Sequence, residues 1–151
     1  MVSTLQKRLM EELRAGGPAR GIEVCSEEAP AIASAISRDG LTIRRVTAKP
    51  RNPANAPDPY EAKVLDAMES SHREGGKAAE HEEVVETADG KEVRYLKPIV
   101  VAGPCLACHG PKESLTPEVR DALAARYPED GATGYASGDF RGAVSVRVRI
   151  D

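Results

Sequence analysis

The first third of the chain repeats its apolar residues with a helical period. Residues 3–14 place leucine and methionine three or four positions apart, at Leu5, Leu9, Met10 and Leu13, which is typical of an amphipathic helix. Ser3 or Thr4 is the expected N-cap of this helix, and the glycines and proline of residues 16–18 interrupt it. We therefore expect an N-terminal helix and its connection over residues 1–20.

A second helical pattern covers residues 21–38. Its apolar stripe holds Ile22, Cys25, Ala29, Ile32, Ala33 and Ile36. Pro30 should kink this helix or begin a new turn within it, because proline has no backbone N–H to donate. The same pattern places Cys25 on the apolar face of the helix.

The middle of the chain changes from an extended to a helical pattern. Residues 41–47 are rich in β-branched side chains and predict a strand. The prolines at positions 50, 53, 57 and 59 predict an extended loop after it. Residues 60–73 return to a helical pattern through Val64, Leu65 and Met68, and the glycines at 75 and 76 should end that helix.

The second half of the chain predicts a sheet. Residues 81–88 and 92–101 flank the turn dipeptide Asp89-Gly90 and predict an antiparallel hairpin. Residues 116–126 predict a helix that Thr116 caps, with Pro117 at its first position. Residues 142–150 alternate and predict a strand that carries Val144, Val146, Val148 and Ile150 on one face. Together these elements predict an α+β fold, an antiparallel sheet flanked by helices, in a single domain over residues 1–151.

Composition and charge narrow the class of protein. The 151 residues include 13 glycines and 11 prolines, but 40% are hydrophobic, so turns are expected rather than disorder. Only 3% are aromatic, and a core with few aromatic rings buries less apolar area per residue. A large apolar group that is not an amino acid would fill the rest of such a core. A net charge of -3 gives no reason to expect a nucleic-acid partner. The longest apolar run, residues 98–105, is too short to cross a bilayer.

Two of the three cysteines carry the clearest chemical signal. Cys105 and Cys108 are separated by two residues and followed at once by His109, which is the C-x-x-C-H pattern of covalent haem attachment. In that chemistry two thiols add to the two vinyl groups of one porphyrin, and the adjacent imidazole binds the iron. The motif should lie in the loop after the hairpin. It predicts one haem c, attached through Cys105 and Cys108, with His109 as an iron ligand.

Other interpretations of C-x-x-C have less support in the sequence. A thioredoxin-like redox pair needs a βαβ context in which the motif opens a helix. A zinc ribbon needs a second C-x-x-C, which the remaining candidates Cys25, His72 and His81 do not form. Candidates for a second iron ligand include Met10, Met68, His72 and His81, but the methionines fit core stripes and the histidines flank a glycine-rich loop. Taken alone, Cys25 is most simply interpreted as a small buried hydrophobic residue.

Covalent haem attachment also bears on localisation. In bacteria this motif implies maturation outside the cytoplasm, and residues 1–8 contain neither an apolar region nor a cleavage site. We therefore expect a periplasmic or otherwise extracytoplasmic protein whose export signal or anchor is absent from this chain.

Sequence blocks beyond the motif cover nearly the whole chain from Ile22 onward. They are residues 22–25, 29–33, 43–46, 51–57, 61, 64–65, 94–99, 105–110, 127–128, 132–135 and 141–146. Through these blocks the chain resembles the bacterial and cyanobacterial DUF3365 family, also called the Tll0287-like haem domain. The resemblance implies a PAS-like fold that carries one c-type haem. It also implies that the iron takes a cysteine thiolate opposite the motif histidine, and the matching residue is Cys25.

The haem propionates need cationic or hydrogen-bonding partners. The matched blocks supply eight candidates, of which we expect two or three to contact the haem: Arg44, Arg45, Arg51, Asn52, Tyr95, Lys97, Tyr135 and Arg141.

A haem with two protein ligands leaves no open position for a substrate, so we do not expect an enzyme. The leading hypothesis is a redox or gas sensor, in which Cys25 leaves the reduced iron and its helix signals to an output domain or partner protein. The alternatives are a small electron-transfer cytochrome that serves a redox partner with both ligands fixed, and a haem-free or zinc-binding interaction module. Residues 3–14 could pair with a second copy in a homodimer, although such leucine stripes more often pack on their own domain.

Overall fold

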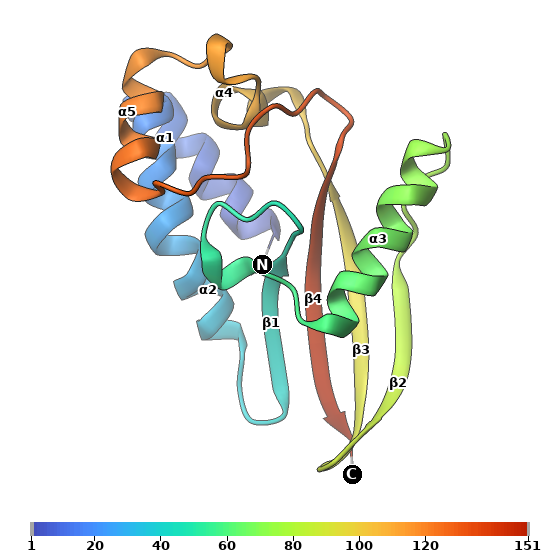
Figure 1. Cartoon of the computed structure of the whole chain (residues 1–151). Helices are drawn as coiled ribbons and strands as arrows, with labels where there is room; N and C mark the ends of the chain where they lie inside the picture. Colours follow the sequence, from blue (N-terminus) through green and yellow to red (C-terminus); the bar gives the residue numbers. More distant parts are fainter. Residues whose placement is uncertain (1, 151) are drawn as a thin grey trace.

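The computed structural model describes residues 2–150, without the side chains of residues 2–4, 6 and 19. A four-stranded antiparallel sheet lies at the centre of the fold, in the order β1-β4-β3-β2. The strands are β1 (Leu41–Val46), β2 (His81–Thr87), β3 (Gly90–Val100) and β4 (Phe140–Ile150). Helix α3 (Pro59–Arg73) crosses the front of the sheet, and the other helices gather beyond β1 (Figure 1). The predicted α+β architecture, an antiparallel sheet with helices, is confirmed.

The N-terminal helix α1 (Val2–Glu23) is bent at Gly17. Gly17 has a φ of 73° and a ψ of -174°, a combination that only glycine adopts readily, and Pro18 follows it. The expected interruption over residues 16–18 is therefore confirmed. The helix begins at Val2, and the side chains of the expected caps, Ser3 and Thr4, lie outside the part of the chain that the structure describes.

The second predicted helix consists of three pieces. The end of α1 leads into a π-helical turn, Val24–Glu28, which α2 (Ala29–Ile36) follows. Pro30 lies in the first turn of α2 and begins it, as expected. The π-turn, which contains Cys25, was not expected, because π-turns are rare single turns within α-helices and the apolar pattern of the sequence does not distinguish them.

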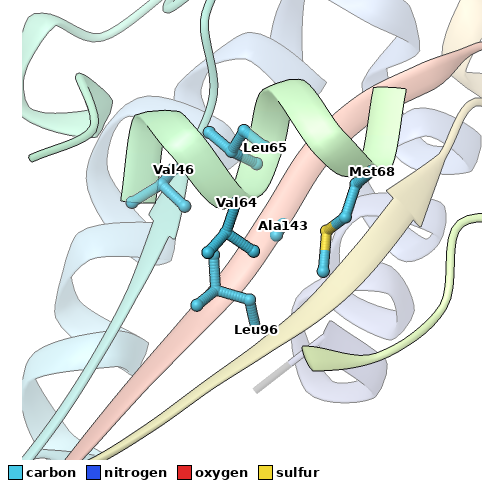
Figure 2. Packing of buried hydrophobic residues seen from close by; sticks show 6 residues of the cluster. All are labelled: Val46, Val64, Leu65, Met68, Leu96 and Ala143. Carbon is cyan, nitrogen blue, oxygen red and sulfur yellow. The ribbon is translucent and has the colours of Figure 1, made fainter. Parts of the chain in front are cut away.

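Helix α3 packs on the sheet through an apolar cluster and a buried carboxylate. Asp58 caps α3 and accepts a hydrogen bond from the backbone N–H of Glu61, whose own side chain accepts one from Asp58. The apolar cluster below the helix contains Val46, Val64, Leu65, Met68, Leu96 and Ala143 (Figure 2). Within the same interface, the fully buried Glu61 accepts a hydrogen bond from Ser145 Oγ at 2.7 Å.

Strand β4 lies between β1 and β3 and presents two different faces. Ala143 and Ser145 are completely buried on the face under α3. The alternate face carries the expected row from Val144 to Ile150, but burial along it decreases: Val144 is buried, whereas Val148 and Ile150 are each 36% exposed. Val146 between them is half-buried, so the cover over this row decreases steadily toward the end of the strand.

Helix α5 (Pro117–Arg126) completes the group of helices beyond β1. Thr116 accepts a hydrogen bond from the Val119 N–H, which confirms the expected cap. Val119 and Leu123 pack with Ile22 and Leu115 in a second apolar cluster, so α5 is fixed against the end of α1. In the described residues, no helix combines the length and hydrophobicity that a membrane span requires.

Candidate cofactor site

The C-x-x-C-H motif lies on a short helix rather than in a loop. A 3-10 turn, Gly103–Cys105, precedes α4 (Leu106–His109), so the expectation of a loop at this place is wrong. The helix is ended by Gly110, where a Cβ would lie 2.7 Å from the Leu106 carbonyl oxygen. One helical turn places the thiols of Cys105 and Cys108 on the same side, and both are free and half-buried.

A cavity connects the motif with Cys25. It lies between α1, the end of β3 and α4, and its empty space, with the open mouth included, is about 1050 Å³. Cys25, Cys105, Cys108 and His109 all line it. The fold thus brings the π-turn of Cys25, near the start of the chain, to a motif in the last third of the sequence.

The Cys25 thiol lies in mostly apolar surroundings. Burial raises the pKa of Cys25, and the nearby guanidinium groups of Arg45 and Arg51 oppose part of that rise. Burial likewise raises the pKa of Cys108. Both thiols are therefore protonated at neutral pH in the haem-free chain, and binding of an iron by Cys25 would release a proton.

The imidazole of His109 is held in one orientation. Its Nδ1 lies 2.7 Å from the carbonyl oxygen of Ala132, so Nδ1 carries the proton and donates it to that oxygen. Burial, with Arg51 and Arg141 nearby, lowers the pKa of His109 to about 3. The imidazole is therefore neutral at physiological pH, and its Nε2 lone pair is available to a metal.

Arg51 connects the motif helix to the loop that orients His109. Its guanidinium donates to the carbonyl oxygens of Cys108 and Ala132 and forms an ion pair with Asp130 at 3.1 Å. Asp130 in turn accepts a hydrogen bond from the Ala132 N–H. Arg51 lines the cavity, but its guanidinium is largely buried and already paired with these groups. Arg51 therefore stabilises the cavity wall and is not free to pair with a ligand.

Tyr135 supports His109 from behind the cavity wall. The two rings meet edge to face with centroids 6.3 Å apart, and the guanidinium of Arg141 lies 5.3 Å from the Tyr135 ring centroid. Tyr135 is buried but does not line the cavity. Its position in the described fold is that of a residue that packs against His109 and limits the movement of the imidazole.

Arg45 and Arg141 are the cavity arginines that remain available. Arg141 donates to Thr47 Oγ1 at 2.8 Å, while its buried Nε has no partner among the described residues. Arg45 lines the cavity, and within the described part of the chain its guanidinium has no hydrogen bond or ion pair. Burial lowers the pKa of both arginines, that of Arg141 to about 10. An uncompensated cation in such surroundings is costly, so the cavity is suited to a ligand that brings negative charge.

Four of the eight propionate candidates lie away from the cavity. Arg44 alternates with Arg45 on β1 and therefore faces α3, where it forms an ion pair with Glu61 at 3.5 Å. Asn52 caps a short turn by accepting from the Ala54 N–H. Lys97 forms an ion pair with Glu80 at 2.9 Å, and Tyr95, on the same strand, does not reach the described lining. In this structure these four residues do not line the cavity, and their contact with a propionate stays a prediction.

The alternative iron ligands are also placed elsewhere. Met68 belongs to the core under α3, and Met10 is absent from the described lining of the cavity. His72 Nε2 lies 2.7 Å from the Gly138 carbonyl oxygen, and His81 Nε2 lies 2.8 Å from the Tyr60 hydroxyl. Across residues 2–150, no three His, Cys, Asp or Glu side chains gather closely enough to hold a metal ion by themselves.

Part of the cavity wall was not assigned to the site from the sequence. Leu5, Leu9 and Leu13 of α1 line the cavity together with Ile22. Their four-residue spacing favours a helix that packs on its own domain. The spacing alone could not show that the leucines line a cavity there. The position of Cys25 on the next apolar stripe was the one available signal.

Comparisons with known proteins agree with this arrangement. The family model described as Tll0287-like matches residues 2–149. The crystal structure of the cyanobacterial haem protein Tll0287 superposes with a TM-score of 0.65 at 25% sequence identity, and the match covers 99% of this chain and 93% of that one. None of the curated proteins matches the chain in sequence.

Proposed function

Since the chain belongs to the Tll0287-like family, we propose that it binds one haem covalently in the cavity beside α4 and acts as a redox or gas sensor. The observation that carries this proposal is the meeting of Cys25 with Cys105, Cys108 and His109 around one cavity. The haem-binding part is further supported by the structural similarity to a solved haem protein.

The residues present fit a haem. Two thiols and one neutral imidazole are the attachment groups and the first axial ligand of a c-type haem, and the third thiol, of Cys25, can serve as the second. Most of the cavity lining is apolar, and Arg45 supplies a cation without a partner among the described residues. A haem offers the complementary surface, an apolar ring system with two carboxylates.

Each site residue has a role in this proposal. Cys105 and Cys108 provide the thiols for attachment, His109 binds the iron through Nε2, and Cys25 provides a thiolate as second ligand. A bound haem supplies one-electron chemistry at its iron. Arg45 and Arg141 neutralise the propionates, while Arg51 and Tyr135 keep the imidazole in position.

Sensing requires that Cys25 can move, and its surroundings favour this. Cys25 lies in a π-turn between two α-helices. Such turns interrupt the regular hydrogen bonding of a helix and are frequent at functional sites. Loss of the thiolate on reduction would let this segment relax and displace its neighbours. With both ligands in place there is no free position for a substrate, so we propose no enzymatic activity.

Spectroscopy of the protein produced with haem-maturation machinery tests the proposal. We expect the absorption of a covalently bound c-type haem, low-spin in the ferric state. Carbon monoxide should bind promptly to the reduced protein as the thiolate leaves. A reduced iron that does not react with carbon monoxide would instead indicate an electron-transfer cytochrome, and a chain without bound haem would refute both functions.

Substitution of Cys25 tests its role as a ligand. Cys25→Ser should change the ferric low-spin spectrum and raise the reduction potential, because a thiolate stabilises ferric iron. Ser26→Ala is the matched control, since Ser26 lies in the same turn but donates to the Glu23 carbonyl oxygen. Identical ferric spectra for Cys25→Ser and the wild type would remove Cys25 from the iron.

The same proposal specifies a compartment and partners. Covalent attachment outside the cytoplasm places the protein in the periplasm or another extracytoplasmic space. A sensor of this kind signals to an output domain or a partner protein, and a gas or a redox partner provides its input.

A further inference from the structure

The N-terminal part of α1 folds back on the segment that holds Cys25. Because the backbone of Gly17 is non-helical, residues 2–16 form a separate helical arm. Close packing at Gly21 brings the arm against the following helix: a Cβ at Gly21 would lie 3.0 Å from side-chain atoms of both Leu9 and Leu13. The arm thereby supplies one wall of the cavity through its leucines.

Two sets of ion pairs hold the arm in this position. Arg8 donates from Nε and one terminal nitrogen to the two carboxylate oxygens of Glu28, both at 3.0 Å. Nearer the bend, Arg20 donates to Glu12 at 3.0 and 3.2 Å. Glu28 is the last residue of the π-turn that contains Cys25. The arm is therefore connected directly to the turn whose position depends on Cys25.

We propose that residues 2–16 form a lid over the cavity, hinged at Gly17 and latched to the Cys25 turn by the ion pair between Arg8 and Glu28. The lid itself follows from the chain alone, whereas its control of ligand access rests on the proposed function. A shift of the π-turn when Cys25 moves would carry Glu28 away from Arg8. The latch is partly exposed, with Arg8 at 42% and Glu28 at 38%, so it holds the lid weakly enough to release it.

Charge reversal tests the latch by hydrogen exchange of the full-length chain. A free helix as short as the arm is unstable in water, so opening of the lid exposes its backbone amides. In Arg8→Glu or Glu28→Arg, we expect amides of residues 5–15 to exchange about two- to fivefold faster. Arg8 also pairs with Glu11 and Glu12 inside the arm, so the double variant, which restores only the latch with its charges exchanged, should exchange more slowly than Arg8→Glu and return part of the way toward the wild type.

A matched ion pair elsewhere provides the control. Arg73 and Glu69 form a 2.7 Å pair on α3, so Arg73→Glu also breaks a partly exposed pair but should leave exchange in residues 5–15 unchanged. Unaltered exchange of the arm in both single latch variants would overturn the latch. So would a double variant that exchanges as fast as the single variants.

The hinge is tested by a glycine substitution. Gly17→Ala forces a side chain into a conformation that glycine alone adopts readily, so the arm should detach and exchange faster. Gly75→Ala is the control, since Gly75 also has a positive φ, of 84°, and open space around it. Equal exchange of the arm in wild type and Gly17→Ala would contradict a hinge at this residue.

Carbon monoxide association with the reduced, haem-loaded protein tests control of access. The latch variants should bind carbon monoxide faster by about the same factor as their arm amides exchange. Faster exchange of the arm with an unchanged association rate would overturn its role as a lid. The absorption spectrum shows beforehand whether the protein carries haem. A protein without haem would contradict the proposed function but not the lid, because the exchange measurements need no haem.

Discussion

His109 combines two requirements of a metal ligand, a fixed orientation and a neutral ring. The Ala132 carbonyl fixes the proton on Nδ1, and burial keeps the ring uncharged by lowering its pKa to about 3. Both effects come from groups around the motif, not from the motif itself. The same four-residue helix in an open loop would lack them.

The low pKa of His109 predicts acid sensitivity of the haem-free chain. The unfolded chain protonates this histidine near pH 6.5, whereas the folded chain does so only near pH 3, so the unfolded state binds more protons between these values. Stability should therefore decrease as the pH falls below about 6.5, by up to about 1.4 kcal/mol per pH unit from this group. Urea unfolding across this range measures the effect, and His109→Gln should show a shallower dependence. Parallel pH profiles for the two chains would contradict the assignment.

Arg45 should affect the haem-free and haem-loaded proteins in opposite directions. In the haem-free chain, Arg45→Met removes an uncompensated cation and should raise the free energy of unfolding by on the order of 1 kcal/mol. In the haem-loaded protein the same change removes a propionate partner and should lower it. Arg51→Met is the control, since Arg51 is paired with Asp130 and its loss should destabilise both forms. A change of the same sign in both forms of Arg45→Met would exclude this role.

The neighbouring residues Arg44 and Arg45 show what could not be predicted at this scale. Both belong to one matched block and both are arginines, so the sequence marked them equally as propionate candidates. In a strand, successive side chains point to opposite faces, and only the packing of α3 and α1 determines which face meets the cavity. The three motif residues needed no such information, because their chemistry depends on local spacing.

Among the elements, α3 depends on one buried carboxylate. Glu61 is completely buried, closes the capping box with Asp58, accepts from Ser145, and forms an ion pair with Arg147 at 3.2 Å. Glu61→Ala removes the acceptor of the Ser145 hydroxyl and of the Asp58 N–H, while Arg147 keeps its ion pair with Asp58, and should lower the free energy of unfolding by about 3 kcal/mol. Chemical denaturation measures the loss, and Glu82→Ala on the exposed side of β2 should change stability by less than about 0.5 kcal/mol. A cost for Glu61→Ala as small as that of the control would show that the network adds little.

Elements with a strong local signal were predicted well. The helix capped by Thr116, the strand that became β1 and the hairpin around Asp89-Gly90 all appear as expected, because capping residues and turn dipeptides act through nearby backbone groups. The π-turn and the short helix α4 were not predicted. Both are only one turn long, and contacts with other segments, such as Arg126 with Glu27 at 3.2 Å, help to fix such short pieces.

For the whole molecule, the scarcity of aromatic residues agrees with a fold built around an open cavity. Only 3% of the residues are aromatic, and the cavity is lined mostly by apolar side chains. The haem-free chain should therefore unfold at a thermal midpoint roughly 6–12 °C below that of the haem-loaded protein, corresponding to about 3 kcal/mol. Differential scanning calorimetry compares the two forms, and coincident midpoints would mean that the chain alone is packed sufficiently.

The position of β4 in the sheet also determines when the sheet can form relative to chain synthesis. Residues 140–150 pair with β1 on one side and β3 on the other, so neither strand acquires this neighbour until the rest of the described chain has been synthesised. Pairing of strands this distant in sequence is slow. Until β4 has paired, Arg141 cannot take its place in the wall of the cavity that Cys105 and Cys108 also line, so enzymes that act on unfolded chains can reach both thiols.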